Sequence, residues 1–424
     1  MKRKFAILLS AMLLTQAVCG CGGAAPSATS SASASTGSIA SKSSEKAVIV
    51  TDEQDFTHEN GITRLAKEIY GDLNVEFFVL SEDAQERETQ ISSLRVEIMA
   101  GGGPDGYLFS SPTSNMTFNG EGRPAALFPD VQRTMQSGAF LPLDDYIKES
   151  EYLRPEDHFA TVFDTGKTDE GQVVLPITYY ASVFLLDKAQ LADPDFTPKT
   201  WDELVNCEDT AVLKVVRNNL YTWCGAGIPR IADYATEKTI LTEENLTAQF
   251  ENLLAMPASE SFDEETALIQ SGSYAQTDEG IAYYAQNKDT VNALAIPNTE
   301  GGVTAFITSY AAINRNSQKA DEVFRFFELL FSDEAQIDPA ETMNDARGTL
   351  LMLGNLNSFL THKNAYLQPD LLESVQSRIN AVRFYSVMDY TIYDTATTLP
   401  WEENPDCAAA AHSVIEALQT RLSE

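Results

Sequence analysis

The chain has 424 residues and a formal net charge of −33, because 62 Asp and Glu residues outnumber 29 Lys and Arg residues. This excess of negative charge repels a phosphate backbone, so nucleic acid is excluded as an expected partner. A hydrophobic fraction of 43% over this length is sufficient for two or three domains with buried cores. The acidity identifies no ligand, since carboxylates spread over a solvated surface mainly keep a protein soluble.

The N-terminal residues follow the order of a bacterial lipoprotein signal. Residues 2–4 are basic, and residues 5–14 form an apolar stretch of about ten residues, shorter than the roughly 20 needed to span a bilayer. Val18 and Gly20 supply the aliphatic and small residues that a lipobox requires before Cys21. The pattern therefore predicts a signal that is cleaved before this cysteine.

Under this interpretation, residues 1–20 are the signal peptide and Cys21 is the diacylated N-terminus of the mature protein. An ordinary secretory signal with incidental cysteines is the alternative. Residues 22–46 are rich in Ser and Ala and almost free of bulky apolar side chains, so they cannot bury enough surface to offset the entropy of ordering. We expect 21–46 to be a disordered tether on the extracellular face of the bacterial cell membrane.

The body begins with alternating strand and helix patterns. Residues 47–50, 74–80 and 106–109 are strand-like, while 61–70 and 83–100 have helical spacing. A βαβαβ order predicts a parallel sheet, with helices on both faces and ligand contacts beyond the carboxyl ends of its strands.

The glycine-rich run at 99–105 is not a phosphate-binding loop. Such a loop follows a strand and opens a helix, whereas these glycines close a predicted helix and lead into a strand. The run is therefore expected to form a helix C-cap and a turn.

No metal site or cofactor is predicted. The four histidines are scattered without a ligand spacing, and Cys207, Cys224 and Cys407 form no C-x-x-C pair. A disulfide between Cys207 and Cys224 and buried free thiols both remain open.

Six segments of the body resemble, in order, the extracellular solute-binding proteins of ABC importers, specifically their sugar-binding cluster, family 1. The most specific is the P-x-T-W-D-E-L run, and the glycine-rich run matches the family's G-x-x-P-D ending. The segments are 89–105, 135–143, 171–176, 196–204, 267–274 and 319–336.

The resemblance implies an α/β, periplasmic-binding-protein-like fold of type II, similar to maltodextrin-binding proteins. Two α/β lobes would be joined by crossing strands near 175–184 and 291–298, with a third crossing after the helix that ends at Gln336. The implied boundaries are 47–178 plus 298–345 for lobe one and 179–297 plus 346–424 for lobe two.

The implied function is non-enzymatic. A membrane-anchored protein would capture a carbohydrate, expected to be an oligosaccharide, in the cleft between the lobes and deliver it to ABC-transporter permeases. We expect a monomer whose only contact with the membrane is the lipid anchor.

Sugar clefts present aromatic faces to the C–H-rich face of a pyranose and polar groups to its hydroxyls. Each candidate ligand contact is chosen because it matches a ligand-contacting position in the resemblance or because it follows a predicted strand. For any one aromatic, core packing is the alternative. The candidates are Asp52, Glu53, Phe109, Ser110, Ser111, Tyr180, Tyr221, Trp223, Tyr274, Tyr385 and Tyr390.

The sequence is also compatible with other functions. A surface-anchored glycoside hydrolase needs two carboxylates at a suitable separation, and sequence spacing cannot locate such a pair. A receptor for peptides or another polar solute, or one that serves a sensor kinase, would share the same fold.

Overall fold

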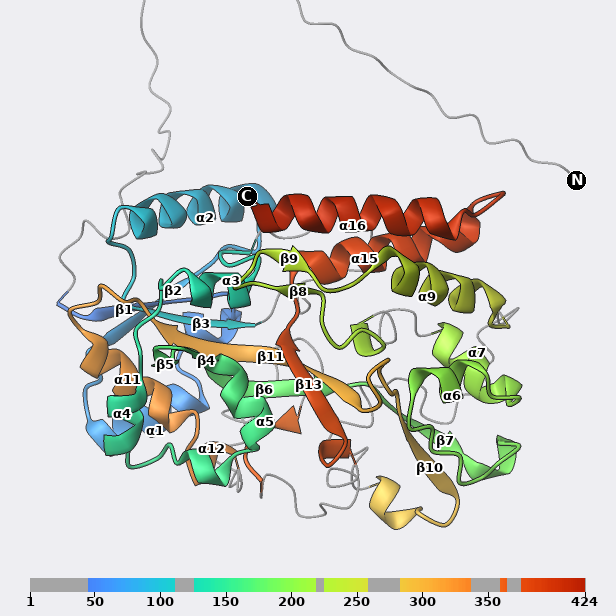
Figure 1. Ribbon diagram of the computed structural model, residues 1–424. Helices are drawn as coiled ribbons and strands as arrows, with labels where there is room; N and C mark the ends of the chain where they lie inside the picture. The colour runs from blue at the N-terminus through green and yellow to red at the C-terminus, as the bar shows by residue number, and fades with distance from the viewer. Residues whose placement is uncertain are drawn as a thin grey trace, which may run out of the picture. The chain divides into compact units, whose positions relative to one another are not determined.

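The computed structural model (Figure 1) describes residues 45–110, 126–218, 225–257, 283–336, 359–363 and 375–423. Residues 38–424 belong to one compact unit, and all the elements below lie in it. Cys21 and the tether up to residue 44 lie outside the described residues.

The N-terminal half of the first lobe has the predicted βαβαβ order. Strand β1 (Ala47–Thr51) pairs in parallel with β2 (Val75–Val79) on one side and with β3 (Gly106–Ser110) on the other. Helices α1 (Gly61–Tyr70) and α2 (Ala84–Met99) connect them. All five bounds agree with the sequence prediction to within one residue at each end.

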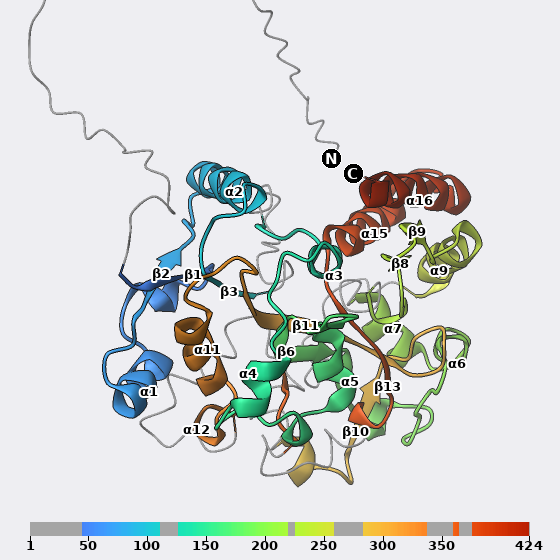
Figure 2. The same ribbon diagram turned by 60° about the vertical axis from the view of Figure 1, so that its left-hand side comes forward.

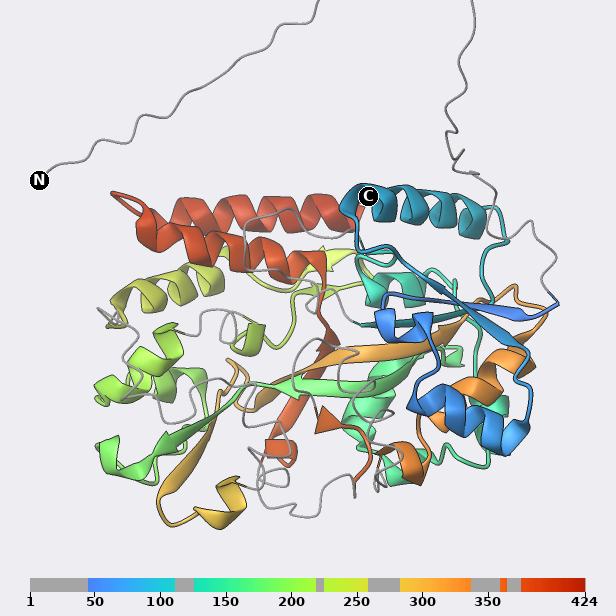
Figure 3. The same cartoon turned by 180° about the vertical axis from the view of Figure 1, so that it is seen from behind.

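Both faces of this sheet are covered because successive residues of β1 point to opposite sides. Ile49 packs in a cluster with residues of α1 and of α11 (Ala320–Leu329), whereas Val50 packs in another cluster with Ile91 and Leu94 of α2. Figure 1 shows α2 above the sheet and α1 and α11 below it, and Figure 3 shows the same layers from behind.

The glycines after α2 form the predicted cap and turn. Gly101 and Gly103 have φ values of 81° and 95°, in the left-handed region that favours glycine. Asp105 then bonds back to β1, because its carboxylate accepts the Val48 N–H at 2.9 Å.

Strand β11 (Val303–Ile313) is the longest strand and all eleven of its residues are buried. It runs antiparallel to β3 and to β6 (Leu175–Ala181), and its first half runs parallel to β13 (Ile379–Phe384). The sheet order is β12-β6-β11-β3-β1-β2, with β13 joined to β11 outside this path.

Two continuous stretches lead from this sheet to the second lobe. Ser182 separates β6 from β7 (Val183–Asp187), and residues 296–302 separate β10 (Val291–Ala295) from β11. Strands β7 and β10 pair with each other antiparallel. These are two of the three positions at which the resemblance predicted crossings, and the third, after Gln336, lies outside the described residues.

A separate apolar cluster forms the core of the second lobe around these two strands. Figure 2 shows its C-terminal helices on the side away from α1 and α11. None of the described helices is long and apolar enough to cross a membrane. The helices in this lobe are α6 (Trp201–Val205), α7 (Thr210–Asn218), α9 (Glu243–Ala255), α15 (Val387–Thr398) and α16 (Cys407–Ser423).

The remaining short elements lie on loops and edges. They are α3 (Val131–Gln136), α4 (Asp144–Glu149), α5 (Ala160–Phe163), β4 (Lys167–Thr168), β5 (Gly171–Gln172), β8 (Ala232–Asp233), β9 (Lys238–Thr239), α12 (Asp333–Gln336) and β12 (Phe359–Leu360).

Motif residues that were expected to pack do pack. Trp201 is 2% exposed in the second core, and the Thr200 hydroxyl caps its helix by accepting the Glu203 N–H at 3.2 Å. Cys207 and Cys407 are free thiols, so Cys207 forms no disulfide.

The lobe boundaries stay a prediction. The segment 359–363, assigned by sequence to lobe two, has described contacts with elements from before residue 180. Strand β12 pairs with β6, and His362 forms an isolated β-bridge with His158.

Gly106 at the start of β3 gives a test of how tightly α11 packs on the sheet. A Cβ there would lie 2.6 Å from Val323 and 3.2 Å from Phe327. We expect Gly106→Ala to lower the free energy of unfolding by about 1–3 kcal/mol, measured by denaturant titration.

Gly102→Ala is the matched control, because its Cβ would meet only the Glu97 carbonyl oxygen at 3.6 Å. Equal stability of the two variants would contradict the close packing of α11 on β3.

Candidate functional site

The predicted polar contact after β1 is engaged in a buried ion pair. The Asp52 carboxylate lies 3.6 Å from the Arg87 guanidinium on α2, and the two side chains are 5% and 6% exposed. Burial, followed by the charge of Asp52, raises the pKa of Tyr310. The charge of Asp52 is thus felt at Tyr310 of β11 and is balanced by Arg87. The backbone N–H of Glu53 donates to the Thr51 hydroxyl at 3.2 Å.

At the end of β3, Phe109 is a core residue in this structure. It is 4% exposed, and its ring centroid lies 6.0 Å from Phe128 and 6.3 Å from Tyr310. Ser110 pairs in register with Ser309 of β11. Phe109 therefore packs in the core, which was the stated alternative to a ligand contact.

Three aromatic side chains meet where the strands leave the first sheet. Tyr180 of β6, Phe306 of β11 and Tyr385 after β13 form a small cluster of their own, and each is 5% exposed. The Phe306 and Tyr385 ring centroids are 6.0 Å apart. Ser182, between β6 and β7, donates to the Tyr180 hydroxyl at 3.4 Å, and burial raises the pKa of Tyr180. The structure thus brings together two of the predicted site residues, and adds Phe306.

Arg383 holds this cluster to the second lobe. Its guanidinium carbon lies 4.7 Å from the Phe306 ring centroid, a distance at which a cation is attracted to the ring face. The same side chain donates to the backbone oxygens of Gly225 at 3.2 Å and Ile228 at 3.1 Å. A Cβ on residue 225 would lie 2.9 Å from the Phe306 ring, so a glycine allows this close approach.

Asp389 balances the charge of Arg383. The two groups form a buried ion pair with side-chain exposures of 6% and 2%. Asp389 also accepts the Ser386 N–H at 2.9 Å and its hydroxyl at 3.1 Å, which caps the start of α15. One buried pair therefore connects β13, β11, the 225–228 turn and α15.

Sequence reasoning missed Arg383 and Phe306. A signal was available for Arg383, because it is the single charged residue in the otherwise apolar or amide-bearing strand 379–384. Charged residues inside such strands are rarely buried unless paired. No comparable signal singled out Phe306.

Tyr390 is not part of this cluster. It lies on α15, where its hydroxyl donates to Asp394 at 3.2 Å and its ring centroid lies 6.0 Å from Tyr393. The other predicted residues, Ser111, Tyr221, Trp223 and Tyr274, lie outside the described residues.

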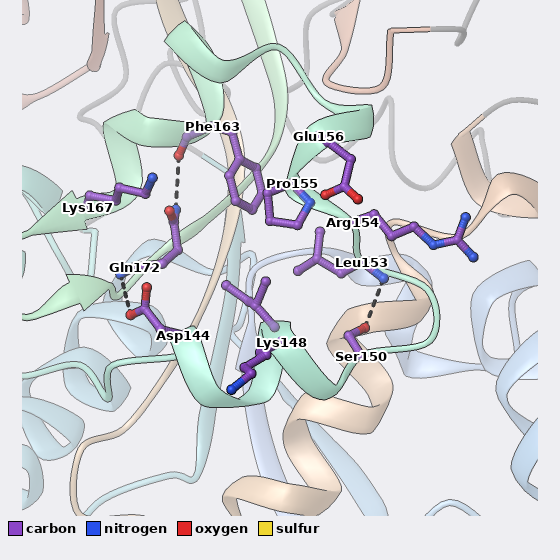
Figure 4. Close-up of a pocket in the computed structure, with 11 residues that line it drawn as sticks. Asp144, Lys148, Ser150, Leu153, Arg154, Pro155, Glu156, Phe163, Lys167 and Gln172 are labelled. Atoms are coloured by element: carbon purple, nitrogen blue, oxygen red, sulfur yellow. Dashed lines mark hydrogen bonds between the residues drawn. The ribbon is translucent and has the colours of Figure 1, made fainter.

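A pocket of about 450 Å³ lies elsewhere, on the first lobe (Figure 4). Asp144 accepts the Gln172 backbone N–H at 2.9 Å, and the Gln172 amide donates to the Phe163 oxygen at 3.0 Å. These bonds tie α4 and α5 to β5. Since none of the predicted site residues lines this pocket, we do not assign the ligand to it.

A second cavity, of about 260 Å³, adjoins Arg383. Gln132 of α3 forms one wall, the turn 229–234 another, and residues 380–383 of β13 a third. The cavity lies between α3, which packs on the first sheet, and the turn 229–234, which packs against the core of the second lobe.

Comparison with known proteins identifies the class. Residues 59–337 match the family model of bacterial extracellular solute-binding proteins, and the chain belongs to this family. No curated protein sequence matches the chain.

Solved structures show the same fold at low identity. A family 1 extracellular solute-binding protein from Alicyclobacillus acidocaldarius is 11% identical with a TM-score of 0.53, covering 89% of this chain and 98% of that one. The sugar-binding protein MalE from Xanthomonas citri is 10% identical with a TM-score of 0.54, covering 89% and 97%. A chitin oligosaccharide binding protein is 16% identical with a TM-score of 0.51, covering 90% and 100%. The fold is therefore the two-lobed α/β fold of MalE-like periplasmic binding proteins.

The buried ion pair gives a testable consequence for stability. Asp389→Asn keeps the shape of the side chain but leaves the Arg383 charge buried without its counter-ion, so we expect a loss of about 3–5 kcal/mol in the free energy of unfolding. Chemical denaturation measures it.

Glu300→Gln is the control, because Glu300 pairs with Arg230 at 3.4 Å with both side chains about half exposed. Its cost should stay below about 1 kcal/mol. A similarly small cost for Asp389→Asn would contradict the structural role of the buried pair.

Proposed function

We propose that this protein is a lipid-anchored receptor that captures a carbohydrate, of oligosaccharide size, between its lobes and delivers it to the permeases of an ABC importer. The observation that carries the proposal is the cluster of Tyr180, Phe306 and Tyr385 at the hinge of a solute-binding fold. Aromatic faces at such a position suit the C–H-rich face of a sugar ring. Two structurally similar proteins are a sugar-binding MalE and a chitin oligosaccharide binder, which supports a carbohydrate ligand.

In this proposal, the hinge cluster is the floor of the cleft. Tyr180 lies in β6, which leads into one crossing, and Tyr385 follows β13, so a ligand on this floor would contact both segments at once. Tyr221, Trp223 and Tyr274 would supply stacking faces from the second lobe. Glu53, Ser110 and Ser111 would bond the hydroxyls from the first lobe, whereas Asp52 is paired with Arg87 in the described structure.

Capture requires no covalent step, and we propose that the protein is not an enzyme. An open form would exchange with a closed form, and the ligand would favour the closed form because only there do both lobes contact it. Ser182 and residues 296–302, which interrupt the crossing strands, are the positions at which we expect rotation. The closed form would then dock on the permeases.

Cys21 would hold the receptor at the membrane. Diacylation of this residue would leave the body as a monomer on the tether 21–46, above the extracellular face. Two acyl chains give stable anchoring where one chain gives only reversible binding.

A thermal-shift screen tests the ligand class. A sugar present at 100 times its dissociation constant should add about 2.7 kcal/mol of stability, and the same sugar should be recovered unchanged. Amino acids and peptides are the controls. Cleavage of the sugar would establish an enzyme instead, and a response to peptides alone would refute the carbohydrate assignment.

Replacing a stacking aromatic tests the site. Trp223→Ala or Tyr274→Ala should weaken binding of the identified sugar by about 1–3 kcal/mol, measured by calorimetry. Trp401→Ala is the matched control, because Trp401 is 88% exposed after α15 and should leave affinity unchanged. Unaltered affinity in a folded Trp223 or Tyr274 variant would remove that residue from the site.

A further inference from the structure

The cavity of about 260 Å³ beside Arg383 differs in charge from the rest of the protein. No Asp or Glu is among the described residues that line it, whereas acidic residues outnumber basic residues by 62 to 29 over the whole chain. The pocket of about 450 Å³ has carboxylates among its cations, and a third cavity, of about 180 Å³, is lined by four carboxylates. The polar side chains that line the cavity beside Arg383 are two guanidinium groups, two amides and a phenol, from Arg230, Arg383, Gln132, Asn380 and Tyr234.

One N–H of Arg383 is buried without an acceptor in the described structure. Its Nη1 pairs with Asp389, and its Nη2 donates to the backbone oxygens of Gly225 at 3.2 Å and Ile228 at 3.1 Å. The Nε–H has no hydrogen-bond partner, although Arg383 is only 5% exposed. A buried donor without an acceptor is costly. An acceptor oxygen in the adjoining cavity would remove this cost.

Two neighbouring side chains also have donors to offer. The Asn380 Oδ1 already accepts a hydrogen bond from the Asn298 amide at 2.7 Å, so the N–H groups of Asn380 are what remain for a ligand. Arg230 is 60% exposed and lies 3.4 Å from the Glu300 carboxylate. A guanidinium has five N–H donors, and one exposed ion pair leaves most of them for a second acceptor.

The donors reach the cavity from different walls. Gln132 lies on α3, which packs on the first sheet, and Arg230 lies in the turn 229–234, which packs against the core of the second lobe. Asn380 and Arg383 come from β13, which forms the third wall. A tetrahedral anion has acceptor oxygens in several directions, so it suits this arrangement better than a planar carboxylate does.

We propose that this cavity binds a phosphate group, either as free phosphate or carried on a sugar, and that the bound group connects α3 to the second lobe. Arginine and amide N–H groups are the donors that phosphate prefers in proteins. Asp389 and Glu300 balance the charges of the two arginines without lining the cavity, so the phosphate is held mainly by hydrogen bonds. This site is separate from the carbohydrate site and does not rest on the proposed function.

Equilibrium dialysis of the purified protein against radiolabelled inorganic phosphate tests the proposal. We expect saturable binding that glucose 6-phosphate displaces and that glucose does not displace. Displacement by glucose 6-phosphate at a lower concentration than by unlabelled phosphate assigns the site to a sugar phosphate. Displacement at an equal or higher concentration assigns it to free phosphate.

Two substitutions change opposite walls of the cavity. Arg230→Gln removes an exposed guanidinium and should weaken phosphate binding about tenfold or more, as expected for the loss of a charged hydrogen bond. Gln132→Glu places a carboxylate on the α3 wall and should abolish binding by charge repulsion. Thermal unfolding of each variant checks that it is folded.

Lys188→Gln is the matched control, because it also removes one positive charge but at a residue that pairs with Asp195 at 3.0 Å and does not line the cavity. Its phosphate affinity should equal that of the unmodified protein. Glu300→Gln is a second comparison, since it frees Arg230 from its ion pair and should strengthen binding.

Three results would overturn the phosphate site. The first is the absence of saturable binding of both phosphate and glucose 6-phosphate. The second is an equal loss of affinity in Arg230→Gln and Lys188→Gln, which would show that only the overall charge matters. The third is a loss in Glu300→Gln as large as that in Arg230→Gln, which would assign the effect to the ion pair. Phosphate binding in a protein that responds to no sugar would leave this site standing and refute the carbohydrate receptor.

Discussion

The described structure depends on the hydrogen bonding of β11. This strand is buried along its whole length, so each of its backbone polar groups needs a partner inside the protein. It finds them in β3 and β6 at one end and in β13 at the other. Because the partners come from distant parts of the chain, the first sheet and the region leading to the second lobe cannot form independently of each other. The aromatic cluster and Arg383 both take their positions from this strand.

The buried charges of the interlobe region form a connected series. Arg383 joins Phe306 and the 225–228 turn to Asp389, which in turn caps the start of α15. A series of this kind is costly to desolvate and gains little over an apolar core in stability alone. Its position beside the cluster of Tyr180, Phe306 and Tyr385 fits a role in which the lobes are held in a limited number of arrangements.

Several parts of this protein were predictable from local patterns. The alternation of strand and helix up to residue 110, the glycine cap after α2 and the buried Trp201 each follow from interactions among residues close in sequence. Phe109 and Asp52 show the limit. Asp52 follows β1 and Phe109 lies near the end of β3, yet Phe109 is packed among Phe128 and Tyr310, and Asp52 is paired with Arg87. Whether a side chain at a strand end faces a ligand or a neighbour depends on which residues the fold places opposite it.

The sequence alone determined the order of the elements, because periodicity and caps act over a few residues. Its short motifs carried the resemblance to the family, and that resemblance implied the crossings. Only the tertiary structure decided which residues meet at the hinge. Tyr180, Phe306 and Tyr385 are more than 75 residues apart from one another. Their contacts arise from strand register and lobe packing, and the chain carries no local signal for either.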